Sequence, residues 1–420
     1  MKQTIQSTKS AQNMQRFVLD NGITLISSYN PSVNIIAARL FLKAGSLYET
    51  RNKAGLSNLL AAVLTKGTQR HSAAEIAEEV ESMGASLGMD AAADYFVISL
   101  KTVATDFVPM LNLVGEMMRT PTFPNSEVEL ERHLTIQSIR SQHEQPFNTA
   151  FSQLREAMYQ DYPYGVSVLG LEETVACLGR DDIEQYHHTY FRPDNLVISI
   201  SGCLKPEEAL GLTKEVFGDW QKPDAPLPTI ELPSITNKPC ETVTKQDSQQ
   251  AIIMVGYLTP SVHHRDYIPL KLINTYLGNG LSSRLFVELR EKRGLAYDVS
   301  AFYPTRLGKS QFAAYIGTAP ENTAIALEGL TREVERLTEV KLSLEEIQAA
   351  KNKLLGQYAL GKQSNGEIAQ LFGWYETLGL GIEFDTHFQE EVAKVTPEIL
   401  QEVACRYFCQ SPYISVVASS

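Results

Sequence analysis

The sequence predicts an α+β protein built from two related halves, and three observations lead to this prediction. Each half mixes strand-like runs with longer helical patterns that are segregated along the chain. A proline-rich segment at residues 221–240 interrupts the middle of the chain, and its proline density excludes a helix or a central strand there. The two halves also end in the same pattern of elements.

The shared ending indicates a duplicated domain. Each half closes with a helical pattern, a Tyr-Phe pair, a polar turn and a buried-type strand, at residues 190–202 and again at residues 407–418. A repeat as long as half the chain is far too long for a solenoid. We therefore expect two homologous domains, residues 1–220 and 241–420, joined by the linker at residues 221–240.

Local patterns place individual elements in both halves. Asn21-Gly22 lies between two apolar runs, which predicts a β-hairpin. Further strands are predicted at residues 34–42, 95–103, 251–258 and 311–316. Helices are predicted at residues 54–64, 72–83, 106–118, 126–142, 320–339 and 343–360.

Composition narrows the class of protein. The chain has 420 residues, with 37 basic and 49 acidic side chains and no basic stripe, which argues against nucleic acid as a main partner. Its 5 cysteines lack the spacing of a disulfide framework or a zinc ribbon, so a reducing compartment is expected. Residues 1–16 lack the apolar region of a secretory signal, and no apolar run is long enough to span a membrane. We expect a cytoplasmic protein, with an organelle as the open alternative.

Residues 55–68 read GLSNLLAAVLTKGT. This stretch resembles the metal-binding helix of the pitrilysin/insulinase-type, or inverzincin, zinc peptidases, which carry H-x-x-E-H followed by Lys-Gly-Thr. In that motif the two histidines lie on one helix face and share a zinc ion, while the glutamate takes a proton from zinc-bound water. The three matching positions here hold Asn58, Ala61 and Ala62, which cannot do these tasks.

The resemblance also implies that the third metal ligand is missing. In the family this ligand is a glutamate in a later helix, and the expected carboxylates align with Gln137 and Ser138. All ligand positions are thus replaced together, and no metal or other cofactor is expected in this chain. Without the resemblance, residues 55–68 read simply as a packed apolar helix.

The similarity extends over residues 17–420. Residues 84–87 and 94–97 look like the family's substrate-edge strand, which implies substrate binding by Asp94, Tyr95 and Phe96. An extended peptide would add to the sheet at residues 94–100, because unpaired strand edges accept a further strand.

A second motif is retained. Residues 278–297 read as a glycine turn, an amphipathic helix, a C-cap at Gly294 and a strand. Arg290 falls on the last helical turn and Tyr297 falls early on the strand. The resemblance implies that both donate hydrogen bonds to the substrate carbonyl and to the developing oxyanion, and so act in catalysis. By pattern alone, the charged run at residues 288–293 reads as a solvated helix face.

Together the resemblance implies a zinc-less, non-catalytic subunit of a heterodimeric zinc metallopeptidase, similar to a mitochondrial processing peptidase or its bacterial-type relatives. Two insulinase-like half-domains, each an antiparallel-rich sheet covered by helices, would form half of a clamshell around an unfolded peptide or presequence. A homologous partner would carry the zinc, and a homodimer stays open. The alternatives are a structural or recognition module like the core proteins of respiratory complexes, and an active enzyme with relocated ligands.

Overall fold

A computed structural model describes residues 14–419 of the chain. Most of the N-terminal segment considered above, residues 1–13, lies outside this description. The described residues fall into two compact units, and neither unit is continuous in sequence. Among the described residues, the first unit draws on residues 14–135, Val168–Ile230 and Leu360–Ile382, and the second on Ile136–Ser167, Glu231–Ala359 and residues 383–419.

The first unit contains a six-stranded sheet in the order β1-β2-β6-β3-β5-β4. Only the β2–β6 pair is parallel, and all other neighbours are antiparallel. Its interior strands are buried, as the continuous apolar runs of β3 and β6 require. The strands are β1 (Met14–Val18), β2 (Thr24–Tyr29), β3 (Ile35–Leu42), β4 (Ser86–Ala91), β5 (Phe96–Val103) and β6 (Leu196–Gly202).

The second unit contains a five-stranded sheet in the order β7-β11-β8-β10-β9. Here too the sheet has one parallel pair, β7–β11, followed by antiparallel neighbours. The strands are β7 (Glu241–Lys245), β8 (Ala251–Thr259), β9 (Asp298–Phe302), β10 (Ser310–Thr318) and β11 (Tyr413–Ala418).

The two sheets repeat one topology. The run β2-β6-β3-β5-β4 matches β7-β11-β8-β10-β9 in strand order and in the direction of every pair. The strands that close the two halves, β6 and β11, hold the same position beside the parallel partner. The predicted α+β class and the predicted antiparallel-rich sheets are thus confirmed.

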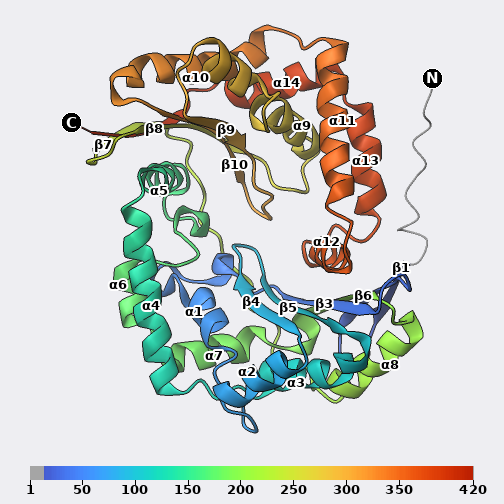
Figure 1. The fold of residues 1–420 in the computed structure, drawn as a ribbon. Coiled ribbons are helices and arrows are strands. Elements are labelled where there is room, and N and C mark those ends of the chain that lie inside the picture. The colour runs from blue at the N-terminus through green and yellow to red at the C-terminus, as the bar shows by residue number, and fades with distance from the viewer. Residues whose placement is uncertain (1–13, 420) are drawn as a thin grey trace. The chain divides into compact units, whose positions relative to one another are not determined.

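Helices cover both faces of each sheet, as Figure 1 shows. In the first unit α3 packs on β5 and α8 packs on β2, while α1 lies against α7 and the edge strand β4. The helices that begin in the first half are α1 (Leu56–Val63), α2 (Ala73–Ser82), α3 (Phe107–Arg119), α4 (Asn125–His143), α5 (Pro146–Tyr159), α6 (Glu172–Cys177), α7 (Arg180–Tyr190) and α8 (Pro206–Phe217).

In the second unit α10 packs on β8 and β10, and α14 packs on α9, α10 and β8. The α-helices of the second half are α9 (Tyr267–Gly278), α10 (Thr323–Glu339), α11 (Leu344–Leu360), α12 (Asn365–Thr377), α13 (Phe384–Lys394) and α14 (Pro397–Phe408), and a π-helix, η7 (Phe286–Lys292), precedes β9.

The halves exchange one helix each. Figure 1 shows the orange α12 against the blue strands of the first sheet and the green α5 against the second sheet. Helix α12 packs on β3, β6 and β2, and α5 packs on β11 and β8. Each helix therefore belongs to the compact unit of the other half. The predicted division at residues 221–240 separates the strands correctly but does not describe these two helices.

Several local expectations are met. Residues 222–240 contain no helix or strand. Gly22 turns the predicted hairpin in the left-handed region at φ 98°, which glycine tolerates best. Ser72 and Glu75 form a capping box at the start of α2. All five cysteines are free, and no helix within residues 14–419 is both long and apolar enough to cross a bilayer.

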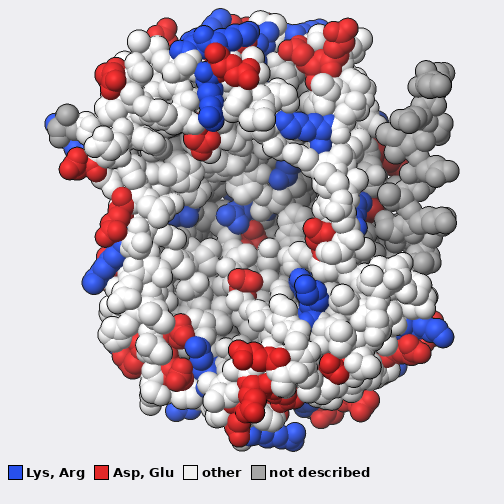
Figure 2. Space-filling view, viewed as in Figure 1, with Lys and Arg blue, Asp and Glu red and all other residues white. Residues whose placement is uncertain are grey.

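Charge is dispersed over the surface seen in Figure 2, where basic and acidic side chains are interspersed over most of the visible face. Acidic groups gather near the bottom of this view, over α2, whose sequence supplies four glutamates, Glu75, Glu78, Glu79 and Glu81. The view therefore offers no basic stripe of the kind that a nucleic acid would require.

Candidate functional site

Helix α1 carries the positions of the expected metal motif, and a buried carboxylate anchors its start. The Glu49 oxygens accept hydrogen bonds from the backbone N–H groups of Gly55, at 2.9 Å, and Ser57, at 2.6 Å. Burial raises the pKa of Glu49, and these hydrogen bonds offset part of that effect. Gly55 begins the helix at φ 98°, where an added Cβ would lie 2.6 Å from the Leu169 carbonyl oxygen. The geometry of the helix start is therefore tightly fixed.

The three motif positions on α1 offer no metal site. Asn58 and Ala62 are half-buried, and Ala61 is buried. An alanine has no donor atom, and a lone amide oxygen is a poor ligand for zinc. Within residues 14–419, no group of three or more His, Cys, Asp or Glu side chains is arranged to hold a metal ion. The residues present do not fit a zinc ion.

The remaining predicted ligand positions lie on α4. Gln137 and Ser138 are both exposed on this long helix. An ion pair of 2.8 Å joins Lys66, which follows α1, to Glu131 on the same helix. The segment after α1 is thus held to α4 by a charge pair, while the two positions further along α4 carry neutral side chains.

Arg290 and Tyr297 flank the turn between η7 and β9 in the second unit. Gly294 closes this turn at φ 63°, and its N–H donates to the Arg290 carbonyl oxygen at 3.1 Å. The Leu295 N–H donates to the Leu289 carbonyl oxygen at 2.9 Å, and Tyr297 extends the pairing of β9 through its N–H to Gly317. The structure thus places Arg290 in the last turn and Tyr297 at the start of the strand, as the sequence predicts.

The polar groups of both side chains are available. Arg290 is exposed, and its guanidinium stacks on the Phe286 ring at 5.0 Å from the centroid. Tyr297 is 55% exposed. Among the described residues, neither side chain has a hydrogen-bond or ion-pair partner. The neighbouring charges differ, because Arg284 pairs with Glu288 and Glu333, and Lys292 pairs with Glu288.

The helix that carries Arg290 is not the regular α-helix that its amphipathic pattern favours. Residues Phe286–Lys292 form a π-helix, in which Leu289 is the buried position. Such helices are rare and frequently occur at functional sites. The wider turn changes which side chains lie above one another, and periodicity alone does not predict it.

The predicted strand addition at residues 94–100 is wrong. Strand β5 already pairs with β3 on one side and with β4 on the other, so it has no free edge. The edge strand is β4, residues Ser86–Ala91. Asp94 and Phe96 are also buried, at 2% and 0% exposure, which leaves only Tyr95 partly accessible among the three predicted binding residues.

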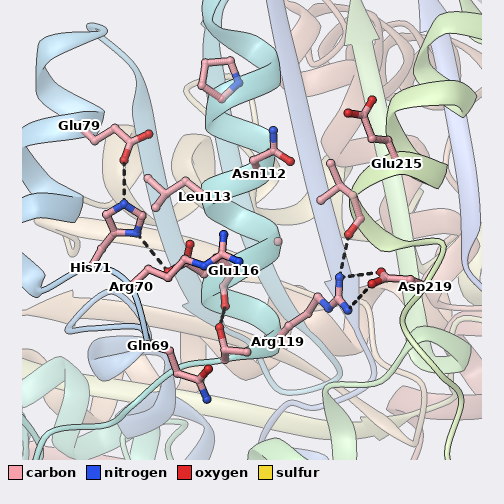
Figure 3. A pocket seen from close by; sticks show the side chains of 14 residues that line it. Gln69, Arg70, His71, Glu79, Asn112, Leu113, Glu116, Arg119, Glu215 and Asp219 are labelled. Atoms are coloured by element: carbon pink, nitrogen blue, oxygen red, sulfur yellow. Dashed lines mark hydrogen bonds and ion pairs between the residues drawn. The ribbon is translucent and has the colours of Figure 1, made fainter.

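A polar cavity of about 700 Å³ lies in the first unit, between the loop after α1 and helices α3 and α8 (Figure 3). The His71 ring lies 3.1 Å from a Glu116 oxygen and 3.9 Å from Glu79. Arg119 makes a two-pronged ion pair with Asp219, at 2.8 and 3.1 Å. One pair joins the loop after α1 to α3, and the other joins α3 to the segment after α8. The charged groups of the cavity therefore pair with each other, which indicates a structural role.

The Glu116 carboxylate on α3 forms the contacts with the loop after α1. Burial would raise its pKa, but hydrogen bonds from Thr68 and His71 and the nearby positive charge lower it below the usual value. Thr68 also accepts from the N–H of His71 at 2.9 Å, so the Lys-Gly-Thr segment after α1 is fixed to α3. Sequence reasoning missed His71 and Glu116, because each acts through a partner distant in sequence.

Comparisons with known proteins agree with this architecture. The profile of the insulinase family, peptidase family M16, matches residues 24–172, and the profile of the peptidase M16 inactive domain matches residues 178–354. An uncharacterised zinc protease of Bacillus subtilis, YmxG, is 26% identical over 372 residues, covering 87% of this chain and 90% of the relative. An uncharacterised zinc protease of Mycobacterium leprae is 26% identical over 399 residues, covering 93% and 88%.

Solved structures show the same fold. A protease from Helicobacter pylori superposes with a TM-score of 0.90 at 21% identity, covering 96% of this chain and 99% of that one. A peptidase M16 inactive domain from Pseudomonas fluorescens gives a TM-score of 0.90 at 22% identity, covering 97% and 98%. At this identity the likeness establishes the architecture and leaves the chemistry to the residues of this chain.

Proposed function

Because the chain belongs to the M16, or insulinase, peptidase family, we propose that it is a zinc-less, non-catalytic subunit of a heterodimeric zinc peptidase. A homologous partner would supply the metal and the catalytic base. This chain would supply Arg290 and Tyr297 together with a surface that holds an unfolded peptide. The observation that carries the proposal is the contrast between α1, whose motif positions hold no ligand, and Arg290 and Tyr297, whose polar groups are unpaired.

The intact scaffold around α1 supports a loss of chemistry without a loss of structure. Glu49 still anchors the helix start, and Lys66 and Thr68 still fix the segment that follows. A carboxylate that accepts two N–H groups at a helix start caps the helix and is favoured by the helix dipole, so it keeps α1 in place without a metal. The position of α1 is therefore fixed by residues outside the motif, while the side chains at positions 58, 61 and 62 are those of a packed helix.

Arg290 and Tyr297 fit a role in stabilising developing negative charge. An arginine offers several N–H donors and a tyrosine offers one O–H donor. Both side chains are held on rigid elements, because Gly294 and the start of β9 fix the turn between them. Donors that are already positioned stabilise a developing oxyanion without reorganising at the moment of reaction.

Mixing this chain with a zinc-bearing M16 homologue from the same organism tests the proposal. We expect cleavage of an unfolded fluorogenic peptide by the mixture and none by this chain alone. Arg290→Ala and Tyr297→Ala should each lower the rate of the mixture by about 10² to 10³-fold, which is the typical effect of removing one oxyanion donor. Arg293→Ala is a matched control, since Arg293 is also exposed but lies 3.9 Å from Glu333.

Two outcomes would contradict the proposal. Full activity of the mixture with both Arg290→Ala and Tyr297→Ala would remove the catalytic role. Stoichiometric zinc in the purified chain alone would instead support an active enzyme with relocated ligands. Metal analysis and the rate assay are independent, so they separate these two cases.

A structural or recognition module is the second candidate. The replacement of all the motif positions on α1 favours it equally, because a module that only binds has no need of a metal. A pull-down from the native organism discriminates between the two. Recovery of a zinc-peptidase homologue supports the first function, and recovery of a membrane complex supports the second.

A further inference from the structure

A second cavity of the first unit, which we call the α12 pocket, has a different character from the polar cavity beside α3. Its volume is about 530 Å³, which falls within the range of small-ligand sites. Strands β3, β4 and β5 contribute one side and the exchanged helix α12 contributes the other. The residues used below are Arg39, Tyr95, Lys101, Glu367, Leu371 and Trp374.

The pocket exists because α12 covers only part of its sheet face. Helix α12 packs on β3, β6 and β2, and the pocket lies beside it, where Ser86 of β4 and Ser99 and Lys101 of β5 line the wall. Arg39 pairs with Ser99, which pairs with Gly88, so these three positions share that face. The wall is firmly held, because the Asn365 side chain donates to the Ile35 carbonyl oxygen at 2.9 Å.

Arg39 is the central feature of the pocket. One of its terminal nitrogens donates to the carbonyl oxygens of Ala38, at 3.0 Å, and Leu100, at 3.3 Å. Its remaining N–H groups have no hydrogen-bond partner among the described residues, and no carboxylate there forms an ion pair with it. Burial lowers the pKa of Arg39, and the charge of Asp90 offsets only part of this. A half-buried guanidinium of this kind is costly unless a partner joins it.

The residues around Arg39 favour a ligand that combines a negative charge with an apolar part. Lys101 adds a second positive charge at the pocket, and it too lacks an ion-pair partner among the described residues. The one acidic lining residue, Glu367, already accepts from the Ser364 N–H at 2.8 Å and from its hydroxyl at 3.0 Å. Tyr95, Leu371 and Trp374 provide apolar and aromatic surface beside the charges. A carboxylate attached to an organic chain fits both the positive charges and the apolar surface. The carboxylate pairs with the arginine guanidinium, and the carbon atoms of the chain contact the apolar wall.

We propose that the α12 pocket binds a carboxylate of the peptide substrate, with Arg39 as its anchor and Trp374 and Leu371 as the wall against which the adjoining residue lies. The carboxylate comes from an acidic side chain or from a free C-terminus. This assignment rests on the proposed peptide-binding function and gives that function a substrate preference. Arg39 on β3 lies two strand spacings, about 10 Å, from the edge strand β4, and β4 contributes Ser86 to the pocket, so the pocket reaches the edge of the sheet.

A set of four labelled peptides tests this assignment by fluorescence anisotropy on the purified chain. The peptides share one unfolded sequence with a central Glu or Gln and with a free or amidated C-terminus. Loss of the charged hydrogen bonds should weaken binding about tenfold. If the side chain is the ligand, the Glu-to-Gln change produces this loss, and if the terminus is the ligand, amidation produces it.

Substitutions identify the site on the protein. Arg39→Gln should abolish the preference for the carboxylate, and Arg39→Lys should retain part of it, because lysine keeps the charge and loses the fork. Lys43→Met is the matched control, since Lys43 is an exposed positive charge just after β3 and outside the pocket. It should leave the preference unchanged, and thermal unfolding of every variant should confirm that it folds.

The outcomes separate the two proposals. Equal binding of all four peptides to the wild-type chain, or an unchanged preference in Arg39→Gln, overturns the carboxylate site and leaves peptide binding intact. Absence of binding by any peptide overturns peptide binding by this chain and the pocket assignment with it. A preference that is lost in Arg39→Gln and kept in Lys43→Met supports both.

Discussion

The two units share a strand order but differ in the chemistry that surrounds it. In the first unit, α1 keeps its carboxylate anchor and carries no ligand at its motif positions. In the second, the segment before edge strand β9 keeps an arginine and a tyrosine whose polar groups have no partner among residues 14–419. The difference shows that the residues that hold an element in place are distinct from the residues at the motif positions.

The largest expected effect concerns the anchor of α1. Glu49→Ala leaves the N–H groups of Gly55 and Ser57 without acceptors inside the protein, so we expect a loss of about 3 kcal/mol in unfolding free energy. Both tryptophans, Trp220 and Trp374, belong to the first unit, so tryptophan fluorescence during denaturation reports on this unit.

The matched control for this loss is Glu291→Ala in the second unit. Glu291 is exposed and has no ion pair or side-chain hydrogen bond among the described residues, so its removal should change stability by less than about 0.5 kcal/mol. A wild-type fluorescence midpoint in Glu49→Ala would mean that the anchor does not hold the helix, and would remove one support of the proposed function.

The next effect distinguishes the units by pH. Burial lowers the pKa of His187, in the first unit, to about 4, and that of Lys271, in the second, to about 8. For both groups the unfolded chain binds the proton more tightly, so stability falls as pH drops through the window between the folded and unfolded values. The first unit should lose about 3 kcal/mol between pH 6.5 and 4, and the second should gain about 3 kcal/mol between pH 8 and 10.5.

Denaturant titrations across pH check this contrast, with fluorescence for the first unit and circular dichroism for the whole chain. His187→Phe should remove most of the loss of stability at acid pH, because phenylalanine keeps the ring between Phe123 and Phe191 without the titrating group. Lys271→Met should remove most of the gain in stability at alkaline pH. If the loss of stability at acid pH persists in His187→Phe, other groups cause it.

Much of the fold could be predicted from the sequence. The hydrophobic periods of β3, β5, β8 and β10 are local signals, and the structure confirms these strands. The exchange of α5 and α12 could not be predicted in this way, because no local pattern says on which sheet an amphipathic helix packs. Only the start of strand β4 was identified, through residues 84–87, since the rest of its short run contains Gly88 and Asp90 and lacks strict alternation.

The candidate sites also differ in how far they could be predicted from local sequence. Arg290 and Tyr297 lie in one contiguous motif, so their elements could be predicted without tertiary information. The α12 pocket brings Arg39 together with residues more than three hundred positions later in the chain. No motif or spacing in the sequence predicts that these residues meet. One signal was present, since Arg39 is the single charged residue in the otherwise apolar strand Ile35–Leu42. A charge in a buried strand is unusual and calls for a partner or a ligand.

A smaller effect compares the two exchanged helices. An added Cβ at Gly373 of α12 would lie 2.5 Å from the Phe41 ring, and one at Gly256 of β8 would lie 2.8 Å from the Met158 sulfur of α5. Because a ring moves less readily than the end of a methionine, Gly373→Ala should cost about 2 kcal/mol and Gly256→Ala about 1 kcal/mol. Equal losses in denaturant unfolding would mean that both contacts yield to the same extent.

The smallest expected effect is on stability at the retained motif. Arg290→Ala should change the unfolding free energy by less than about 0.5 kcal/mol, because Arg290 is exposed and has no hydrogen-bond or ion-pair partner among the described residues. Arg284→Ala, six residues earlier, should cost about 2 kcal/mol, since it leaves the buried Glu333 carboxylate without its 2.7 Å partner. A residue that contributes nothing to stability yet lowers the rate of the mixed peptidase is retained for its chemistry. A large loss of stability in Arg290→Ala would instead make it a packing residue and remove the contrast between the units.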